Sequence, residues 1–286
     1  MLRYLPLILT TAALGLHLLG ERLAVVLTGR PRSRAARRRA ISFYAGLLTI
    51  FVALAGPIDS LAEKLFWVHM VQHVLLLTVA PPLIVLAAPW MSVWRPLPLG
   101  LRRGLAGTVA RSPRLAWLRA ACRWLGRPRG SWLAFAVNLL AWHVPAVYDL
   151  ALRSTAVHAL EHLLYVVTGI LLWSQVLHSP PLRIRLTLPQ RVYYMTAAIL
   201  VGWVLALILT FAQSPLYPIY AHLASRPGGI SALTDQQLAA GVMLVPGSLT
   251  MTLYVFFEIY RWLGQDPEGE RPRRRRPARA EVGGAR

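Results

Sequence analysis

Seven apolar segments, each close to the length that a helix needs to cross a bilayer, constrain the fold of this chain more than any other feature. A transmembrane helix takes about 20 mostly apolar residues. The composition agrees, because 56% of the 286 residues are hydrophobic and only 15% are charged, whereas soluble domains carry about 25% charged residues. The sequence therefore predicts an all-α, polytopic transmembrane helical bundle of seven spans, at about 4–27, 41–58, 67–88, 131–150, 157–177, 193–212 and 238–262.

Four of these segments have unusual features. The first follows Met1-Leu-Arg as the apolar core of a signal peptide would, but no small-x-small cleavage site precedes Glu21, so we expect a retained helix. The second is the shortest. The third contains Pro81-Pro82, whose missing N–H groups should kink the helix or break its last turn. Pro246 and Gly247 should distort the seventh.

The distribution of basic residues predicts how the bundle is oriented. The chain has a net charge of +20, and its Arg blocks lie between predicted spans one and two, three and four, and five and six, and after span seven. Short cytoplasmic loops of membrane proteins are enriched in Lys and Arg. We therefore expect the N-terminus outside and the C-terminus in the cytoplasm. The basic residues on the predicted outer side are Arg3, Lys64, Arg153 and Arg226.

The same pattern divides the chain into two parts. Residues 1–263 form the predicted domain in the cytoplasmic (plasma) membrane, and residues 264–286 form a basic cytoplasmic tail that we expect to be disordered. The Arg95–Arg129 connection mixes Trp with Arg and predicts an interfacial amphipathic helix on anionic lipid. The lipid bilayer, and not nucleic acid, is the predicted partner of the Arg blocks, because they separate apolar runs instead of covering a soluble face.

Five histidines fall in the outer halves of three predicted spans. His69 and His73 open the third span, and His158 and His162 open the fifth, each pair with i, i+4 spacing that puts both imidazoles on one helix face. His143 lies near the outer end of the fourth. Two histidines so spaced can bind one metal ion, and imidazole ligands suit copper or zinc.

Other residues in the same zone are candidates for an auxiliary role. Thioether sulfurs favour Cu(I), and carboxylates orient metal-bound imidazoles. The candidates for additional ligands or for such supporting contacts are Met70, Met243, Asp149, Glu161 and Asp235, although Asp235 can equally be a helix N-cap.

Two other interpretations of the five histidines stay open, a structural polar network and a proton relay. Ionisable residues within spans are costly and usually functional, which favours ligation of a metal or of heme. We expect His17, His178 and His222 to be anchors or hydrogen-bond partners. No hydrolase or nucleotide-binding motif is present, and the single cysteine, Cys122, excludes a Cys-x-x-Cys site, so the sequence does not predict an enzyme.

Four motifs in order carry a resemblance to a known family. They are His69-Met-Val-Gln-His followed by Pro81-Pro-Leu, Trp142-His-Val-Pro with Tyr148-Asp149, His158-Ala-Leu-Glu-His, and Asp235-Gln-Gln-Leu-Ala-Ala-Gly with Met243. Over roughly residues 5–263 the chain resembles the CtaG-type, seven-span cytochrome c oxidase assembly factors. The resemblance implies a non-enzymatic membrane chaperone that matures a caa-type heme–copper oxidase. The family's histidines would correspond to His69, His73, His143, His158 and His162.

The first hypothesis for function is therefore a copper-handling assembly factor that binds copper near the outer face and passes it to an oxidase subunit. A heme-binding membrane oxidoreductase is the second, with bis-His ligation by a pair such as His73 and His162. A copper transporter is the third. It would need coordinating groups across the membrane, whereas the predicted inner half holds little beyond His178.

Overall fold

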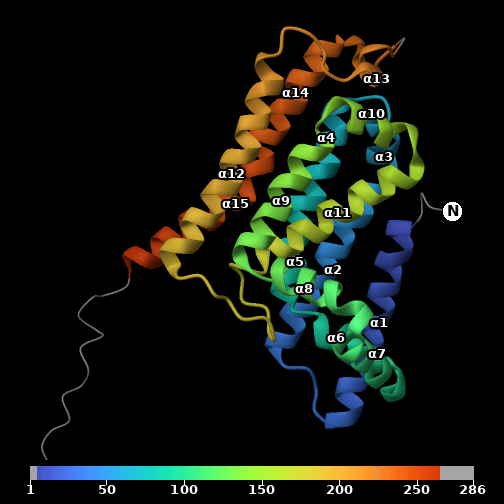
Figure 1. Cartoon of the computed structure of the whole chain (residues 1–286), viewed down its shortest axis with the longest axis vertical. Coiled ribbons are helices and arrows are strands. Elements are labelled where there is room, and N and C mark those ends of the chain that lie inside the picture. The colour runs from blue at the N-terminus through green and yellow to red at the C-terminus, as the bar shows by residue number, and fades with distance from the viewer. Residues whose placement is uncertain (1–4, 224, 265–286) are drawn as a thin grey trace, which may run out of the picture.

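The computed structural model describes residues 5–223 and 225–264, which fold into a bundle of long helices with short helices at both ends (Figure 1). Within those residues the structure is all-helical, as predicted. The short helices α3 (Pro57–Ala62), α10 (Pro145–Arg153) and α13 (Pro218–Ala221) lie at one end, here called the α10 end. The helices α6 (Trp90–Trp94), α7 (Leu99–Arg111) and α8 (Ala116–Leu125) lie at the opposite end, the α7 end.

Nine further helices of the described residues make up the length of the bundle between the two ends, with α4 and α5 joined into one stretch. They are α1 (Leu5–Thr28), α2 (Arg34–Leu54), α4 (Phe66–Val74), α5 (Ala80–Ala87), α9 (Pro128–Trp142), α11 (Thr155–Trp173), α12 (Leu188–Phe211), α14 (Ala232–Leu244) and α15 (Pro246–Leu263). Two 3₁₀ turns, Pro113–Leu115 and Pro227–Gly229, lie in connections. The predicted tail, 264–286, lies outside the described residues except for Gly264.

Five helical stretches in the described part are long and apolar enough to cross a membrane, and a bent pair, α9 with α10, makes a sixth candidate. The chain is thus a multi-pass membrane protein. The remaining predicted span corresponds to α2, which is 21 residues long but begins with four Arg in its first six residues. Its apolar part, Ala40–Leu54, extends roughly 22 Å, which is shorter than a hydrocarbon core of about 30 Å.

The fourth predicted span, 131–150, is wrong as a single helix. Helix α9 ends at Trp142, and α10 starts at Pro145 with its axis bent by 78°. Pro145 supplies no N–H for the helix ladder, and it holds Val144 in an extended conformation (φ −66°, ψ 123°). The apolar composition continues through this break, which is why the segment looked like one span. The break leaves His143 at the C-cap of α9.

The third predicted span is continuous, but its irregularity comes before the two prolines. Helix α4 passes into a π-helical segment, Leu75–Val79, and then into α5. Pro81 and Pro82 therefore occupy the start of α5, and the wider π turn precedes the point where their N–H groups are missing. The irregularity of this span is thus a π segment that ends just before the two prolines. The seventh predicted span is divided at Val245 into α14 and α15, next to Pro246 and Gly247 as expected.

The π segment and α5 lie at the centre of the bundle, packed between α2 and α11. Gly169 of α11 allows this approach, because a Cβ there would lie 2.7 Å from the Leu77 carbonyl oxygen and 2.6 Å from Pro81 Cγ. The buried core around it includes Leu76, Tyr165 and Leu172. Close packing of α11 against the π segment and α5 brings the histidines of α11 near those of α4.

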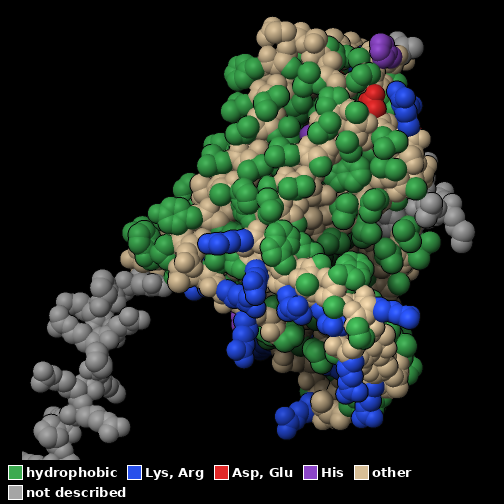
Figure 2. Space-filling view, viewed as in Figure 1, with side chains coloured by type: hydrophobic (Ala, Val, Ile, Leu, Met, Phe, Trp, Pro, Cys, Tyr) green, Lys and Arg blue, Asp and Glu red, His purple; other side chains and the backbone are tan. Residues whose placement is uncertain are grey.

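Charge is distributed unevenly between the two ends. Lys and Arg side chains gather at the α7 end of the visible face, and hydrophobic side chains cover most of the length above it (Figure 2). The Arg95–Arg129 connection forms α7 and α8, so it contains two helices where one was expected. Arg119 ties them together by donating to the carbonyl oxygens of Val109 and Ser112, while Trp117 and Trp124 are exposed.

Candidate metal centre

Four imidazoles from two helices meet near the α10 end of the bundle. His69 and His73 lie on α4, and His158 and His162 on α11. The Nε2 atoms of His69 and His73 are 2.8 Å apart, and the rings of His69 and His158 are 5.2 Å apart between centroids. The i, i+4 spacing in the sequence thus corresponds to two pairs that face one another. We call His69, His73, His158, His162 and the adjacent Glu161 the imidazole cluster.

The donor atoms of the imidazole cluster are spaced as metal ligands are. One nitrogen each from His69, His73 and His162 lie within 4.8 Å of one another, and a second such group joins His69, His158 and Glu161. Two nitrogens bound to one ion at about 2.0 Å in tetrahedral geometry are about 3.3 Å apart. Small side-chain rotations therefore suffice to bring three donors around one ion.

Glu161 lies inside the imidazole cluster instead of only supporting it. Its side chain is fully buried, Oε1 is 3.4 Å from His73 Nε2, and neither oxygen has a hydrogen-bond partner among the described residues. A buried carboxylate needs a proton, a counter-charge or a metal ion. Glu161 is therefore placed to contribute an oxygen directly to a bound cation, which is the first of the two roles considered for it from the sequence.

Tyr220, on α13, orients the imidazole of His69. The Tyr220 hydroxyl donates to the Ala62 carbonyl oxygen at 2.6 Å, and burial raises the pKa of this phenol, so it stays protonated. His69 Nδ1, 3.2 Å from the same oxygen, must then be the donor of their hydrogen bond. This leaves His69 Nε2 with its lone pair directed toward His73, as a metal ligand requires.

Tyr220 was not predicted from the sequence, and neither were two other tyrosines at the site. The Tyr165 ring lies 4.3 Å from that of His73, and the Tyr217 hydroxyl donates to the His143 carbonyl oxygen at 3.1 Å. Tyr217 and Tyr220 belong to a connection between predicted spans, where the only available signal was a pair of aromatic residues three positions apart. Nothing in the spacing linked them to histidines far away in the chain.

Asp235 acts at a helix terminus next to the imidazole cluster. Its two carboxylate oxygens accept hydrogen bonds from the backbone N–H groups of Phe66 (2.9 Å) and Trp67 (3.0 Å) at the start of α4. Arg226 Nε is 3.9 Å from Asp235 Oδ2. The N-cap of Asp235's own helix, α14, is Ser231. Asp235 therefore holds the first turn of the helix that carries His69 and His73.

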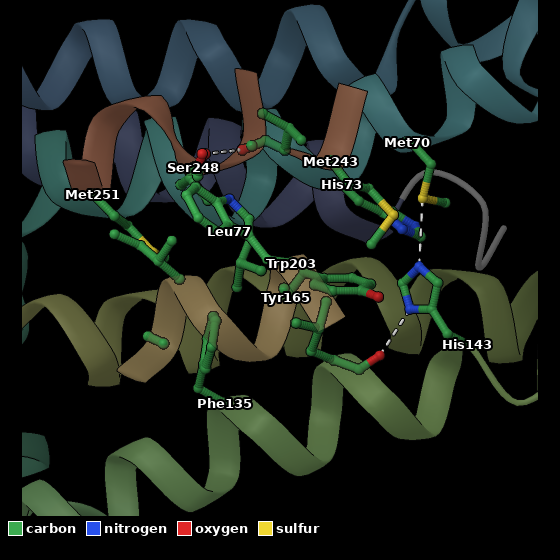
Figure 3. Close-up of a pocket in the computed structure, with 17 residues that line it drawn as sticks. Met70, His73, Leu77, Phe135, His143, Tyr165, Trp203, Met243, Ser248 and Met251 are labelled. Carbon is green, nitrogen blue, oxygen red and sulfur yellow. Dashed lines mark hydrogen bonds between the residues drawn. The ribbon is translucent and has the colours of Figure 1, made fainter. Parts of the chain in front are cut away.

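His143 and the two candidate methionines form a separate group beside the imidazole cluster. The His143 ring centroid is 6.4 Å from that of His73, and His143 Nε2 is 3.5 Å from Met70 Sδ. Met70, His143, Met243 and His73 line one cavity (Figure 3). Four of the five predicted histidines thus belong to the imidazole cluster, and His143 belongs to the separate group with Met70 and Met243.

The remaining predicted residues lie apart from both groups. Asp149 pairs with Arg153 on its own helix at 3.6 Å and, within the described part of the chain, makes no contact with an imidazole. His17 is buried and stacks on Phe43 with 4.4 Å between ring centroids, while His178 and His222 are exposed. Their anchoring roles stay predictions.

Comparison with known proteins identifies the chain at the family level. Residues 22–265 match the sequence model of the cytochrome c oxidase caa3 assembly factors (Caa3_CtaG). The chain belongs to this family. No curated protein and no solved structure shows significant similarity to it. The matched region of the caa3 assembly factor contains α2–α15 and therefore both groups of candidate ligands.

A cavity of about 490 Å³ gives this assembly factor access to the imidazole cluster from the α10 end. It lies between the ends of α1 and α2 and the helices α3, α10 and α11. His158 and His162 lie on its wall, together with the acidic side chains Asp59 and Glu63. Acidic side chains that line a cavity give it a negative potential, which attracts cations.

Proposed function

We propose that this caa3 assembly factor binds copper as its cargo in the imidazole cluster and delivers it to a subunit of the oxidase. The observation that supports this most is the buried donor set itself. The 2.8 Å separation of the His69 and His73 Nε2 atoms, with Glu161 3.4 Å from the latter, has the spacing of ligands around one ion. The family supplies the oxidase, whose maturation requires copper.

We further propose the orientation that the Arg blocks predict. If α2 also crosses the membrane, the total is seven spans. The bundle then has its N-terminus outside, and the basic α7 end and the tail face the cytoplasm. The membrane domain then comprises residues 1–263 in the bacterial plasma membrane. The imidazole cluster and its access cavity lie near the outer face, where an oxidase subunit with an external copper site is accessible.

The donor chemistry favours copper, although zinc accepts the same imidazole and carboxylate ligands. Met70 and Met243 are two of the three methionines that line the cavity next to His73, and sulfur ligands of this kind favour copper over zinc. The four imidazoles and Glu161 are confined to one end of the bundle. This arrangement supports a docking site for an ion that is handed on, and not a path of ligands across the membrane.

The test is copper binding by the purified protein, prepared with a tag that contains no histidine. The wild type should bind copper tightly, and the His69→Ala/His73→Ala variant should lose at least about tenfold in affinity, since even indirect partners of metal ligands act on that scale. His222→Ala is the matched control, because that imidazole is exposed and outside the cluster.

Undiminished copper binding by the double variant would remove the site assignment. A Soret band in the purified protein would instead support heme ligation by a pair such as His73 and His162. In cells, a strain lacking the protein should assemble oxidase without its copper. The wild-type gene should restore the copper content of the oxidase, and the gene for the double variant should not.

A further inference from the structure

The contact between His143 and Met70 joins two lone-pair donors with no proton between them. His143 Nδ1 lies 2.8 Å from the Leu139 carbonyl oxygen, which can only accept, so Nδ1 carries the proton of the neutral imidazole. His143 Nε2 then carries a lone pair, and it faces Met70 Sδ at 3.5 Å. A thioether sulfur has no hydrogen to donate. The geometry is therefore that of two Lewis bases directed at one point.

Such a pair is unfavourable unless something bridges it. Both side chains are buried, with 6% of His143 and 1% of Met70 exposed. A buried acceptor without a donor is disfavoured, and protonating His143 would place a charge in a cavity with mostly apolar walls. A soft cation satisfies both atoms at once, because thioethers and imidazoles are ligands of Cu(I).

The distance between the two atoms fits a shared ion. With metal–nitrogen and metal–sulfur bonds of about 2.0 and 2.3 Å, a separation of 3.5 Å corresponds to an angle of about 110° at the ion. Trigonal and tetrahedral sites have angles of about this size. No backbone movement is needed to reach it.

A third donor borders the same space. Met243, from α14, lines the cavity with Met70 and His143, and in Figure 3 its sulfur lies on the side of His73 and Met70. His73 is also on the cavity wall, while its Nε2 contacts His69 in the imidazole cluster. His73 thus stands between a nitrogen–oxygen donor set and a nitrogen–sulfur donor set.

We propose that Met70, His143 and Met243 form a second metal site, selective for Cu(I) and other soft monovalent ions, next to the imidazole cluster. The proposal rests on the proposed function only for the identity of the physiological ion. The two sites differ in ligand chemistry, so each can be removed separately and probed with an ion that prefers it.

The experiment measures the affinity of the full-length protein in detergent for two ions. Ag(I) is a redox-inert soft probe, and Zn(II) is a borderline probe. Met70→Leu/Met243→Leu nearly conserves side-chain volume and should lower Ag(I) affinity at least tenfold while Zn(II) affinity changes less than twofold. His69→Ala/His158→Ala should do the reverse. Met195→Leu, a buried methionine on α12 that does not line the cavity, is the control.

X-ray absorption of the Cu(I)-loaded wild type supplies a structural readout. A sulfur shell at about 2.3 Å is expected, and it should disappear in the Met70→Leu/Met243→Leu variant. Unchanged Ag(I) affinity in that variant, or a Cu(I) spectrum with only nitrogen and oxygen neighbours, overturns the second site. If the wild type bound Cu(I) and Ag(I) through sulfur but the His69→Ala/His158→Ala variant bound copper and Zn(II) as well as the wild type does, the proposed function of the imidazole cluster would be contradicted and the second site would stand.

Discussion

Tyr220 is the side chain through which the connection between α12 and α14 reaches the imidazole cluster. Its hydroxyl contacts both the Ala62 carbonyl oxygen and His69 Nδ1. A partner of this kind fixes which ring nitrogen is available to a metal, and its loss lowers metal affinity by about 10–100-fold in known sites. The contribution of Tyr220 is thus to hold the imidazole of His69, a proposed ligand, in position.

Removing the Tyr220 hydroxyl should therefore weaken copper binding without unfolding the protein. We expect Tyr220→Phe to lower copper affinity about tenfold, because the freed His69 imidazole can rotate or change tautomer. The measurement is a competition titration with a copper chelator. Tyr260→Phe, at an exposed position on α15, is the control. Equal affinities of Tyr220→Phe and wild type would show that His69 needs no such support.

At the scale of the helices, the start of α4 is the element on which the imidazole cluster most depends. Its first backbone N–H groups lack acceptors within the helix, and Asp235 of α14 supplies them. Helix α14 packs extensively along α4, so the contact joins two elements that are distant in the sequence. The position of His69 and His73 is therefore set partly by another span.

We expect Asp235→Ala to lower the thermal stability of the protein, because loss of a capping carboxylate costs about 0.5–2 kcal/mol and leaves Arg226 without its counter-charge. The thermal stability of Asp235→Asn should lie between those of the wild type and Asp235→Ala, since an amide retains one accepting oxygen. Size-exclusion chromatography of samples heated to a series of temperatures measures the midpoint of thermal unfolding. Asp149→Asn is the control, because the one ion pair of Asp149 among the described residues is with the exposed Arg153. If the alanine variant matches Asp149→Asn, the cap does not stabilise α4.

The sequence predicted helices well where periodicity or apolar length carried the information. The i, i+4 histidines of α4 and α11 required only that each helix be regular there, and both pairs converge. The break before Pro145 was not predicted, because the segment from Ser131 to Leu150 stays apolar on both sides of it. The grouping of His143 with Met70, and the contacts of Tyr220 and Asp235, depend on tertiary packing that no local pattern records.

The whole molecule is polarised between a basic end and an end that carries candidate ligands. Cys122, the single cysteine, is exposed on α8 at the α7 end. It therefore offers a probe of the proposed orientation without further engineering. The opposite end can be sampled at Ser225, which is exposed in the connection after α13.

A membrane-impermeant maleimide should leave Cys122 unlabelled in intact spheroplasts and label it after permeabilisation. In a Cys122→Ser background, Ser225→Cys should be labelled without permeabilisation. Mass spectrometry of the purified protein measures the labelling at each of the two positions. The reverse pattern would invert the proposed topology, and labelling of both positions in intact cells would show that the two ends lie on one side.

The access cavity and the imidazole cluster lie at the same end of the bundle. An ion that arrives and departs by one end crosses little of the membrane's electric field, and the potential does work only on charge moved through that field. Loading and release are then governed by relative affinity, as in ligand exchange between two proteins in solution. Dissipating the membrane potential with an ionophore should leave the handover unchanged.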